Sequence, residues 1–282
     1  DIASCLVGSE MCIRDRSLLA PVKTTVRANI SRGSVDDIIN KLENEGFNVE
    51  KDDILPFCLH VSGQTIVNSR AFKDGYVSIQ DKSSMMVAHI MKLGRDDKVL
   101  DACSAPGGKA CHMAEILSPE GQIDATDIHS HKIDLIKHNI KKLKLDNIHA
   151  FQHDATEPYD GLYDKILVDA PCSGLGVLRH KPEIKYTQSQ DSIQSLVDLQ
   201  LQILENIKHN IKPGGTITYS TCTIEQMENE NVIYTFLKQN EEFEFEPFQH
   251  PVTGKQVKTL QILPQDFDSD GFFITQIKRK ES

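Results

Sequence analysis

Two cysteines each follow an apolar run that we predict to be a buried strand. Cys172 stands in the sequence DAPCSG and Cys222 in the sequence YSTC. A third predicted strand ends at Asp101 and leads into a glycine turn around Gly107. In an open α/β sheet, the carboxyl ends of such strands meet at one edge, where ligands bind. We therefore expect two thiols and a nucleotide-like cofactor to share one crevice, an arrangement that favours nucleophilic attack on a ring carbon.

Length and composition indicate a globular protein. The chain has 282 residues, enough for one large α/β domain and a small additional unit. Hydrophobic residues make up 39% and charged residues 26%, as is typical of such domains. No apolar run approaches the roughly 20 residues that cross a bilayer, so we expect no membrane partner. The seven cysteines contain no CxxC pair, which argues against a disulfide framework or a metal site. We expect a cytoplasmic monomer.

The charge pattern is ambiguous about a nucleic-acid partner. A net charge of −10 argues mildly against one, because Lys and Arg must neutralise phosphates. Local clusters matter more than the total. The basic clusters are Lys132, Lys137, Lys141, Lys142 and Lys144, and Arg179, His180, Lys181 and Lys185. The first is equally well explained as a solvated helix face, and the second is the better candidate for gripping a substrate phosphate.

The chain divides into three parts. Residues 1–17 are interpreted as a non-native tail, because 6–16 resembles translated sequencing-adapter read-through; a genuine flexible tail is the alternative. Residues 18–75 are predicted to form a small α+β unit. It should contain strands at 24–30, 58–61 and 65–68, and a helix that Ser34 caps. Residues 76–282 are predicted to form the catalytic domain.

Strands and helices alternate from residue 98 onward. This rhythm indicates an α/β fold with a mostly parallel, Rossmann-like sheet that is covered on both faces. The predicted strands are 98–101, 122–127, 148–151, 165–169 and 216–220, and the predicted helices are 108–117, 131–143, 190–211 and 225–239. Residues 213–215 (PGG) are read as a sharp stop after the third helix. Residues 271–277 should add a last strand, antiparallel at the edge of the sheet.

Acidic residues follow successive predicted strands at the ligand edge. Asp127 lies about 20 residues after Gly107, where a carboxylate can bond ribose hydroxyls, and Asp154 and Asp169 follow the next two strands. Each of them could also be an ordinary turn or cap residue. Gly107 and Gly108 allow close backbone approach to a ligand. The turn lacks the GxGxxG pattern of pyrophosphate binders, which disfavours a Rossmann dehydrogenase and favours S-adenosylmethionine as the cofactor.

These motifs resemble those of the RsmB/Sun-type RNA cytosine-5 methyltransferases. The resemblance runs from about residue 22 to 278 and is closest to the bacterial branch that modifies small-subunit (16S) ribosomal RNA. It rests on the segments 80–84, 101–109, 169–174, 219–222 and 270–273. Members of that branch usually carry an N-terminal helical RNA-binding domain that resembles NusB. This sequence does not include it, so we expect the natural protein to be longer at that end.

The resemblance implies a class I S-adenosylmethionine-dependent fold and methyl transfer to C5 of a cytosine in RNA through a covalent adduct at C6. It gives Cys222 the attacking role, Cys172 a role in product release, and Asp169 a hydrogen bond to N3 of the base. It implies cofactor contacts from Cys103, Ser104, Ala105, Pro106, Gly107, Gly108, Lys109, Asp127, Asp154 and Asp169, with no metal. The 18–75 unit would guide RNA, with Arg27, Arg32 and Arg70 as candidate contacts.

Several alternatives remain open at this stage. Both cysteines could be buried structural thiols, since free cysteine is among the most buried residue types. A DNA cytosine-5 methyltransferase would attack with Cys172 and leave Cys222 idle, and a tRNA cytosine is another possible target. A non-catalytic assembly factor could bind ribosomal RNA through the same fold. An attacking Cys222 also needs a lowered pKa, which we expect from a nearby positive group or from the helix predicted to begin near Glu225.

Overall fold

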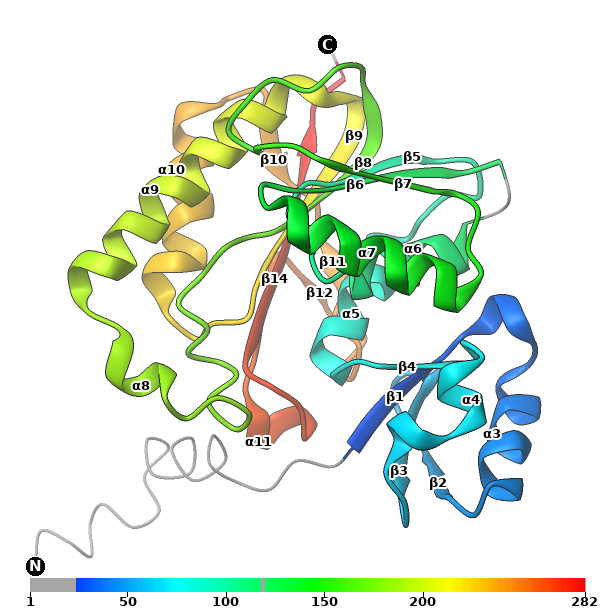
Figure 1. Ribbon diagram of the computed structural model, residues 1–282. Coiled ribbons are helices and arrows are strands. Elements are labelled where there is room, and N and C mark those ends of the chain that lie inside the picture. The colour runs from blue at the N-terminus through cyan, green and yellow to red at the C-terminus, as the bar shows by residue number, and fades with distance from the viewer. Residues whose placement is uncertain (1–23, 118–119, 282) are drawn as a thin grey trace, which may run out of the picture.

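The computed structural model of the chain describes residues 24–117 and 120–281, folded as a small unit beneath a larger α/β domain (Figure 1). The tail predicted at 1–17 lies outside these residues. Within the described ranges, no helix has both the length and the apolar character that a membrane crossing requires.

The small unit is a four-stranded antiparallel sheet in the order β2-β3-β1-β4. Its elements are β1 (Thr24–Ala28), α3 (Val35–Asn44), β2 (Asn48–Lys51), β3 (Cys58–Ser62), α4 (Arg70–Lys73) and β4 (Val77–Ile79). Ser34 caps α3 as predicted, because its hydroxyl accepts the N–H of Asp37 at 3.1 Å. The sheet includes β4 and so extends beyond residue 75, where we predicted the unit to end.

The strand predicted at 65–68 is wrong. Residues Ile66–Asn68 form a short 3-10 helix. Ser69 then caps α4 by accepting the N–H of Phe72 at 3.0 Å. The Ile-Val pair has strand propensity, but only Ile66 is buried while Val67 is 42% exposed. Residues 66–68 run directly into the cap of α4 and pair with no strand of the sheet. Strand propensity alone therefore does not decide the structure of this segment.

The large sheet has the order β10-β14-β9-β8-β5-β6-β7, with β13 also pairing to β14. Its parallel strands are β5 (Lys98–Asp101), β6 (Gln122–Asp127), β7 (Ile148–Gln152), β8 (Tyr163–Asp169) and β9 (Ile211–Thr221). Its antiparallel strands are β10 (Phe243–Phe245), β13 (Thr259–Ile262) and β14 (Phe272–Arg279). The mostly parallel sheet confirms the predicted Rossmann-like class.

The position of the last strand differs from our prediction. β14 is antiparallel as expected, but it lies between β9 and β10 rather than at the edge. Residues 272–277 are all buried. A strand buried on both faces reads as a continuous apolar run and needs neighbours on both sides. The short segments that supply those neighbours carried no comparable signal.

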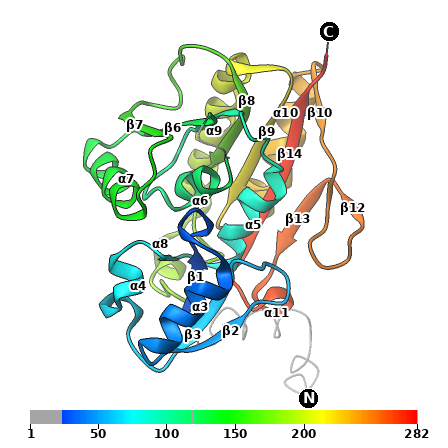
Figure 2. The same cartoon turned by 90° about the vertical axis from the view of Figure 1, so that its right-hand side faces the viewer.

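Helices cover both faces of the large sheet (Figure 2). On one face, α6 (Gly108–Ile116) and α7 (Ser130–Leu143) pack on β6, and α5 (Lys82–Met91) packs on β9 and β14. On the other face, α9 (Gln190–Ile207) and α10 (Glu230–Gln239) pack on β8 and β9. The long helix ends at Ile207, and residues 213–215 lie in β9, so they do not form the helix stop that we predicted.

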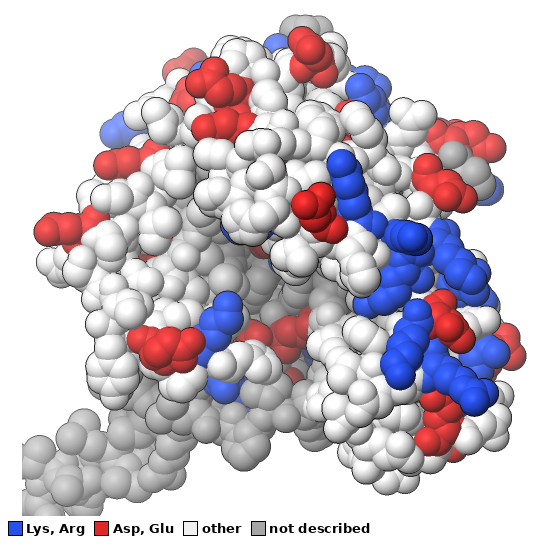
Figure 3. Space-filling model, in the orientation of Figure 1, with Lys and Arg blue, Asp and Glu red and all other residues white. Residues whose placement is uncertain are grey.

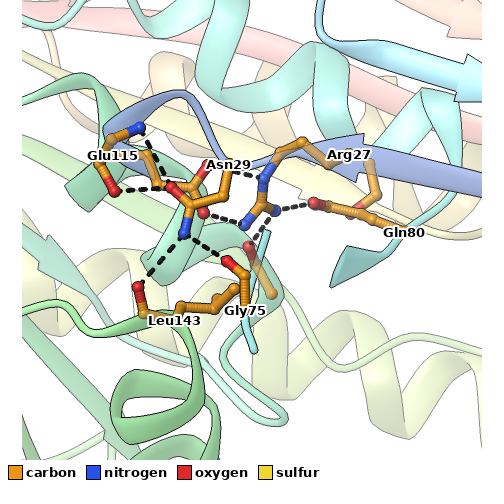
Figure 4. Close-up of polar contacts among 9 residues, drawn as sticks. Arg27, Asn29, Gly75, Gln80, Glu115 and Leu143 are labelled. Carbon is orange, nitrogen blue, oxygen red and sulfur yellow. Dashed lines mark hydrogen bonds and ion pairs between the residues drawn. The ribbon is translucent and has the colours of Figure 1, made fainter. Parts of the chain in front are cut away.

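Buried polar contacts join the small unit to the large domain (Figure 4). Arg27 of β1 forms an ion pair with Glu115 of α6 at 2.6 Å, and both side chains are 0% exposed. The same guanidinium donates to Gln80 and, at 3.0 Å, to the carbonyl of Gly108. The predicted contact of Arg27 with RNA is therefore wrong, because its guanidinium is buried and paired with Glu115.

Candidate active site

The two cysteines meet across neighbouring parallel strands. Asp169 at the end of β8 is in register with Ser220 near the end of β9. Each cysteine follows its strand within a few residues, so both thiols emerge at the same sheet edge. The Sγ atoms of Cys172 and Cys222 are 3.4 Å apart. The structure thus brings together the two residues that we singled out first, although 50 positions separate them in the sequence.

Backbone hydrogen bonds lock the loops that carry the thiols. The N–H of Gly176 donates to the carbonyl of Cys222 at 2.9 Å, and the N–H of Gly271 donates to the carbonyl of Gly176 at 2.9 Å. A Cβ at Gly176 would lie 2.0 Å from the Gly271 carbonyl oxygen, so only glycine fits this crossing. The loops after β8 and β9 and the segment before β14 therefore meet at Gly176.

Asp169 is held by two neighbours. Its Oδ2 lies 2.7 Å from Nζ of Lys109, and its Oδ1 accepts the Ser220 hydroxyl at 2.8 Å. Lys109 lies on the first turn of α6, and its ammonium is 5.1 Å from the centroid of the Phe272 ring. Burial by itself lowers the pKa of Lys109, but the Asp169 carboxylate raises it above the usual value. The ammonium is therefore held charged beside the thiols.

The environment differentiates the two thiols. The pKa of Cys222 is lowered, first by the hydrogen bond from Cys172. Burial and the Asp169 carboxylate oppose this effect, and Lys109 supports it. The pKa of Cys172 is raised by the same hydrogen bond, by burial and by the carboxylate of Glu228. We assign the thiolate to Cys222, because the hydrogen bond from Cys172 is the largest influence on its pKa and favours its charged form. The helix that we expected to assist, α10, begins only at Glu230.

Glu228 supports the Cys172 loop, and our sequence reasoning missed it. This carboxylate is 0% exposed and accepts the N–H of Ser173 at 2.8 Å and its hydroxyl at 2.5 Å. The side-chain amide of Gln200 also donates to it at 3.3 Å. No motif marks Glu228, since its partners lie far away in the sequence.

A cavity of about 230 Å³ lies beside the glycine turn. It is lined by Ile79, Gln80, Asp81, Ser84, Asp101, Cys103, Ser104, Ala105, Pro106, Gly108, Lys109 and Asp169. Most of the predicted cofactor residues therefore share one cavity, whereas Gly107, Asp127 and Asp154 are not in its lining. Gly107 adopts a φ of +96°, which favours glycine, and packs against Ile136.

Asp101, which we gave no individual role, lies at the centre of this edge. It is 0% exposed, and neither carboxylate oxygen has a hydrogen-bond partner of good geometry among the described residues. Burial, and then the neighbouring Asp169, raise its pKa to about 7. Its place at the end of β5 was the available signal. The pKa of Cys103 is raised by burial and by Asp101, Asp169 and Asp127, so three carboxylates surround that thiol.

Asp127 and Asp154 lie at the carboxyl ends of two neighbouring strands, β6 and β7. Asp127 closes β6, is 7% exposed, and accepts the N–H of His129 at 3.0 Å; Lys132 lies 3.7 Å away. Asp154 follows β7 and accepts the N–H and the hydroxyl of Thr156 at 2.9 and 2.7 Å, which lowers its pKa. Both residues therefore also stabilise turns, as the alternative interpretation held.

The prediction that the basic cluster at 179–185 grips a substrate phosphate is wrong for Arg179, whose side chain is buried, and stays a prediction for His180. The Arg179 side chain is 2% exposed and donates to the carbonyl of Ser269 at 2.9 Å. His180 lies 3.3 Å from Asp270. These side chains hold the loop against the segment that precedes β14. Lys181 is exposed, and the side chain of Lys185 lies outside what the structure describes.

One other cluster carries metal-ligating groups, namely Asp52, Cys58 and His60 in the small unit. Their ligand atoms lie within 4.8 Å of one another. The ammonium of Lys82, however, lies 2.6 Å from Oδ2 of Asp52. Burial raises the pKa of the Cys58 thiol to about 12. A lysine already supplies the positive charge here, so this cluster does not fit a metal ion.

The sequence is similar to a known protein family and to individual bacterial proteins. A family model described as 16S rRNA methyltransferase RsmB/F matches residues 88–278. The chain is 40% identical over 272 residues to "Probable ribosomal RNA small subunit methyltransferase B" of Bacillus subtilis, covering 93% of this chain and 61% of that protein. It is 32% identical over 266 residues to "Ribosomal RNA small subunit methyltransferase B" of Proteus mirabilis, covering 90% and 58%. The chain thus spans about three-fifths of these relatives.

Solved structures share the fold over nearly the whole chain. A methyltransferase homolog protein from Pyrococcus horikoshii is 27% identical, with a TM-score of 0.83 and coverage of 97% of this chain and 92% of that one. NSun6 from Pyrococcus horikoshii, solved with SFG, has a TM-score of 0.87 at 21% identity, with coverage of 100% and 97%. At 21% identity, the similarity to NSun6 shows a shared fold and nothing more. Both include the small unit as well as the large sheet, because their coverage of this chain is almost complete.

Proposed function

Because the chain belongs to the 16S rRNA methyltransferase RsmB/F family, we propose that it transfers a methyl group from S-adenosylmethionine to C5 of a cytosine in small-subunit ribosomal RNA. The observation that carries this proposal is the 3.4 Å contact between the Cys172 and Cys222 sulfurs. Two adjacent thiols with opposite pKa shifts, beside a half-buried carboxylate–ammonium pair, suit an enzyme that forms and then releases a covalent adduct with its base.

The first chemical task is to activate C5 of the cytosine, which is a poor nucleophile. The Cys222 thiolate adds to C6, so an S–C6 bond forms and the electrons of the C5–C6 double bond move toward C5 and N3. We propose that N3 takes up a proton from water as this charge develops and that the Asp169 carboxylate accepts a hydrogen bond from the resulting N3–H. Lys109, 2.7 Å behind that carboxylate, offsets the developing negative charge, and Ser220 fixes its other oxygen at 2.8 Å.

The second task is to release the product. After C5 has gained the methyl group, its proton passes to water, the electron pair of the C5–H bond re-forms the C5–C6 double bond, and the S–C6 bond breaks; N3 returns its proton to water. The electron pair of the S–C6 bond returns to Cys222. Cys172 keeps its proton because its hydrogen bond with Cys222, then burial and Glu228, raise its pKa. We propose that it assists release by donating that proton to the departing Cys222 sulfur, 3.4 Å away.

The residues of the sheet edge fit the proposed cofactor. When bound, S-adenosylmethionine supplies a methyl group on a positively charged sulfonium sulfur. Asp101, Asp127 and Asp169 make this edge acidic, as the raised pKa of Cys103 reflects. Carboxylates suit ribose hydroxyls and an amino-acid ammonium group, which are all donors. We propose that residues 103–109 hold the cofactor together with Asp127, Asp154 and Asp169, and that Asp101 assists them.

Methyl transfer from radiolabelled S-adenosylmethionine to an unmodified 16S RNA transcript tests this proposal. Label should appear as 5-methylcytosine with the wild-type chain and with Cys111→Ala, which removes a buried thiol outside the site. It should be lost with Cys222→Ala. Full activity of Cys222→Ala would transfer the attack to Cys172, as in the DNA enzymes. RNA binding by the wild-type chain without any label transfer would favour the non-catalytic assembly factor.

A further inference from the structure

A groove between the small unit and the large domain is lined by lysines from both. It encloses about 530 Å³. Its walls contain Phe72, Lys73 and Asp74 from the small unit and Lys141, Lys142 and Lys144 from the end of α7. Lys and Arg side chains gather on this face, over α7 and the small unit (Figure 3). The groove shares no lining residue with the cavity at the glycine turn.

Most of these ammonium groups are not used inside the protein. Lys73, Lys141 and Lys144 are exposed, and none of them has an ion-pair partner within 24–117 or 120–281. Lys137, one turn before Lys141, is also exposed and unpaired within those ranges. Positions 137 and 141 fall on one face of α7, and Lys144 is the residue that directly follows the helix. Like charges at the spacing of Lys137 and Lys141 repel each other in a helix.

The groove exists only when the two units are docked, and the docking is tight. The Asn29 side-chain amide donates to the carbonyls of Gly75 at 2.9 Å and Leu143 at 3.2 Å (Figure 4). A Cβ on Gly75 would lie 2.1 Å from the carbonyl oxygen of Lys142. Nζ of Lys142 stands 3.9 Å from the centroid of the Phe72 ring. The two walls that carry the lysines are therefore fixed against each other.

We infer that this groove binds the sugar–phosphate backbone of the RNA substrate, away from the reacting base. The inference rests on the proposed function, because that function makes RNA the substrate. A concentrated row of unpaired lysines on a chain of net charge −10 is the electrostatic footprint of a polyanion site. Lysines at the end of α7 also offset the helix dipole. That role does not explain Lys73 on the opposite wall or Lys137 one turn earlier.

The test compares two double variants of the chain that each remove two exposed, unpaired lysines. Lys141→Ala/Lys144→Ala alters the groove, and Lys238→Ala/Lys255→Ala is the control with the same change in net charge. Binding of an unmodified 16S RNA fragment is measured across a salt series. The groove variant should bind about tenfold or more weakly at low salt. Its log–log salt slope should fall by about 1.4, the value for two lost contacts to a single strand. The control should match the wild type.

The outcomes separate this inference from the proposed function. At saturating RNA the groove variant should keep the wild-type kcat while its KM for RNA rises, because the thiols are untouched. If the wild-type chain transferred no methyl group but the groove variant still lost RNA affinity, the proposed function would fail and the groove would stand. Unchanged affinity and salt slope in the groove variant would overturn the inference. Unchanged RNA binding with lost binding of polyglutamate would assign the groove to an acidic protein and also overturn it.

Discussion

Replacing Arg27 by methionine tests how strongly the two units depend on the ion pair buried between them. Arg27 and Glu115 are both 0% exposed, and their closest nitrogen and oxygen atoms are 2.6 Å apart. Methionine keeps most of the apolar volume but leaves the Glu115 carboxylate without its cation. The Gly108 carbonyl also loses a donor that stands at 3.0 Å.

The expected loss is large compared with the stability of a domain. Removing one partner of a buried pair costs about 3–5 kcal/mol, because the remaining charge is left desolvated and unpaired. The total stability of a domain is typically about 5–15 kcal/mol. The Arg27→Met chain should therefore fold but unfold at a much lower urea concentration. The ion pair spans β1 and α6, so the small unit and the cofactor turn should loosen together.

Urea unfolding followed by circular dichroism measures the free energy of unfolding and its m-value. Arg70→Met, which changes an exposed arginine in the same unit, is the matched control and should stay within about 0.5 kcal/mol of the wild type. The double variant Arg27→Met/Glu115→Met removes both charges. It should recover most of the loss, because an apolar pair of similar volume can replace a buried ion pair.

The loss should also depend on pH, with a definite sign. Burial raises the pKa of Glu115 above its ordinary value of 4.5, and Arg27 partly counteracts this. Without Arg27 the pKa of Glu115 in the folded state rises further, which favours its protonated form. The deficit of Arg27→Met should therefore be largest at neutral pH and shrink as the pH falls toward 4.5. A loss below about 1 kcal/mol at pH 7, or a double variant as unstable as the single one, would refute this reasoning.

Three further predictions follow from the site. Asp127→Ala should weaken S-adenosylmethionine binding by about 1–3 kcal/mol, because the ribose hydroxyls lose an acceptor; an unchanged dissociation constant in calorimetry would remove Asp127 from the site. Cys172→Ala should raise the pKa of Cys222, because the thiolate loses its hydrogen bond. The midpoint of Cys222 alkylation by iodoacetamide should then move to higher pH, and an unmoved midpoint contradicts the thiol pairing. Gly176→Ala should destabilise the chain by about 1–3 kcal/mol, because its Cβ would meet the Gly271 carbonyl at 2.0 Å; an unchanged thermal melt would show that the crossing can relax.

Much of the large domain could be predicted because each element carries its own local signal. β5 and β6 have the predicted bounds, and α7 starts one residue before its predicted start. Buried parallel strands read as short apolar runs, and amphipathic helices repeat every 3.6 residues, so neither signal needs a distant partner. The position of β14 and the 3-10 helix at Ile66–Asn68 could not be predicted in this way, because each depends on which strands are available to pair.

The residues of the candidate site also differ in whether the sequence alone could predict them. Cys172, Cys222 and Asp169 were predictable, because they directly follow strands whose ends must share an edge. Glu228 was not, because its importance comes from contacts with Ser173 and Gln200, which other elements carry. The pKa of Cys222 was expected to depend on a helix, whereas its first cause is the thiol of Cys172.

The sequence by itself determined the main strands and long helices from β5 to α10 and the residue types that end those strands. Only the tertiary structure decided which charged side chains form ion pairs inside the protein and which stay exposed and able to bind a ligand. Arg27 was predicted to contact RNA and is instead buried against Glu115, whereas Lys141 and Lys144 remain exposed and unpaired in the described part of the chain. An ion pair or a hydrogen bond requires two groups within a few ångströms of each other. Folding brings such groups together from distant positions, so a charged side chain cannot be assigned to the interior or to a partner from its local sequence.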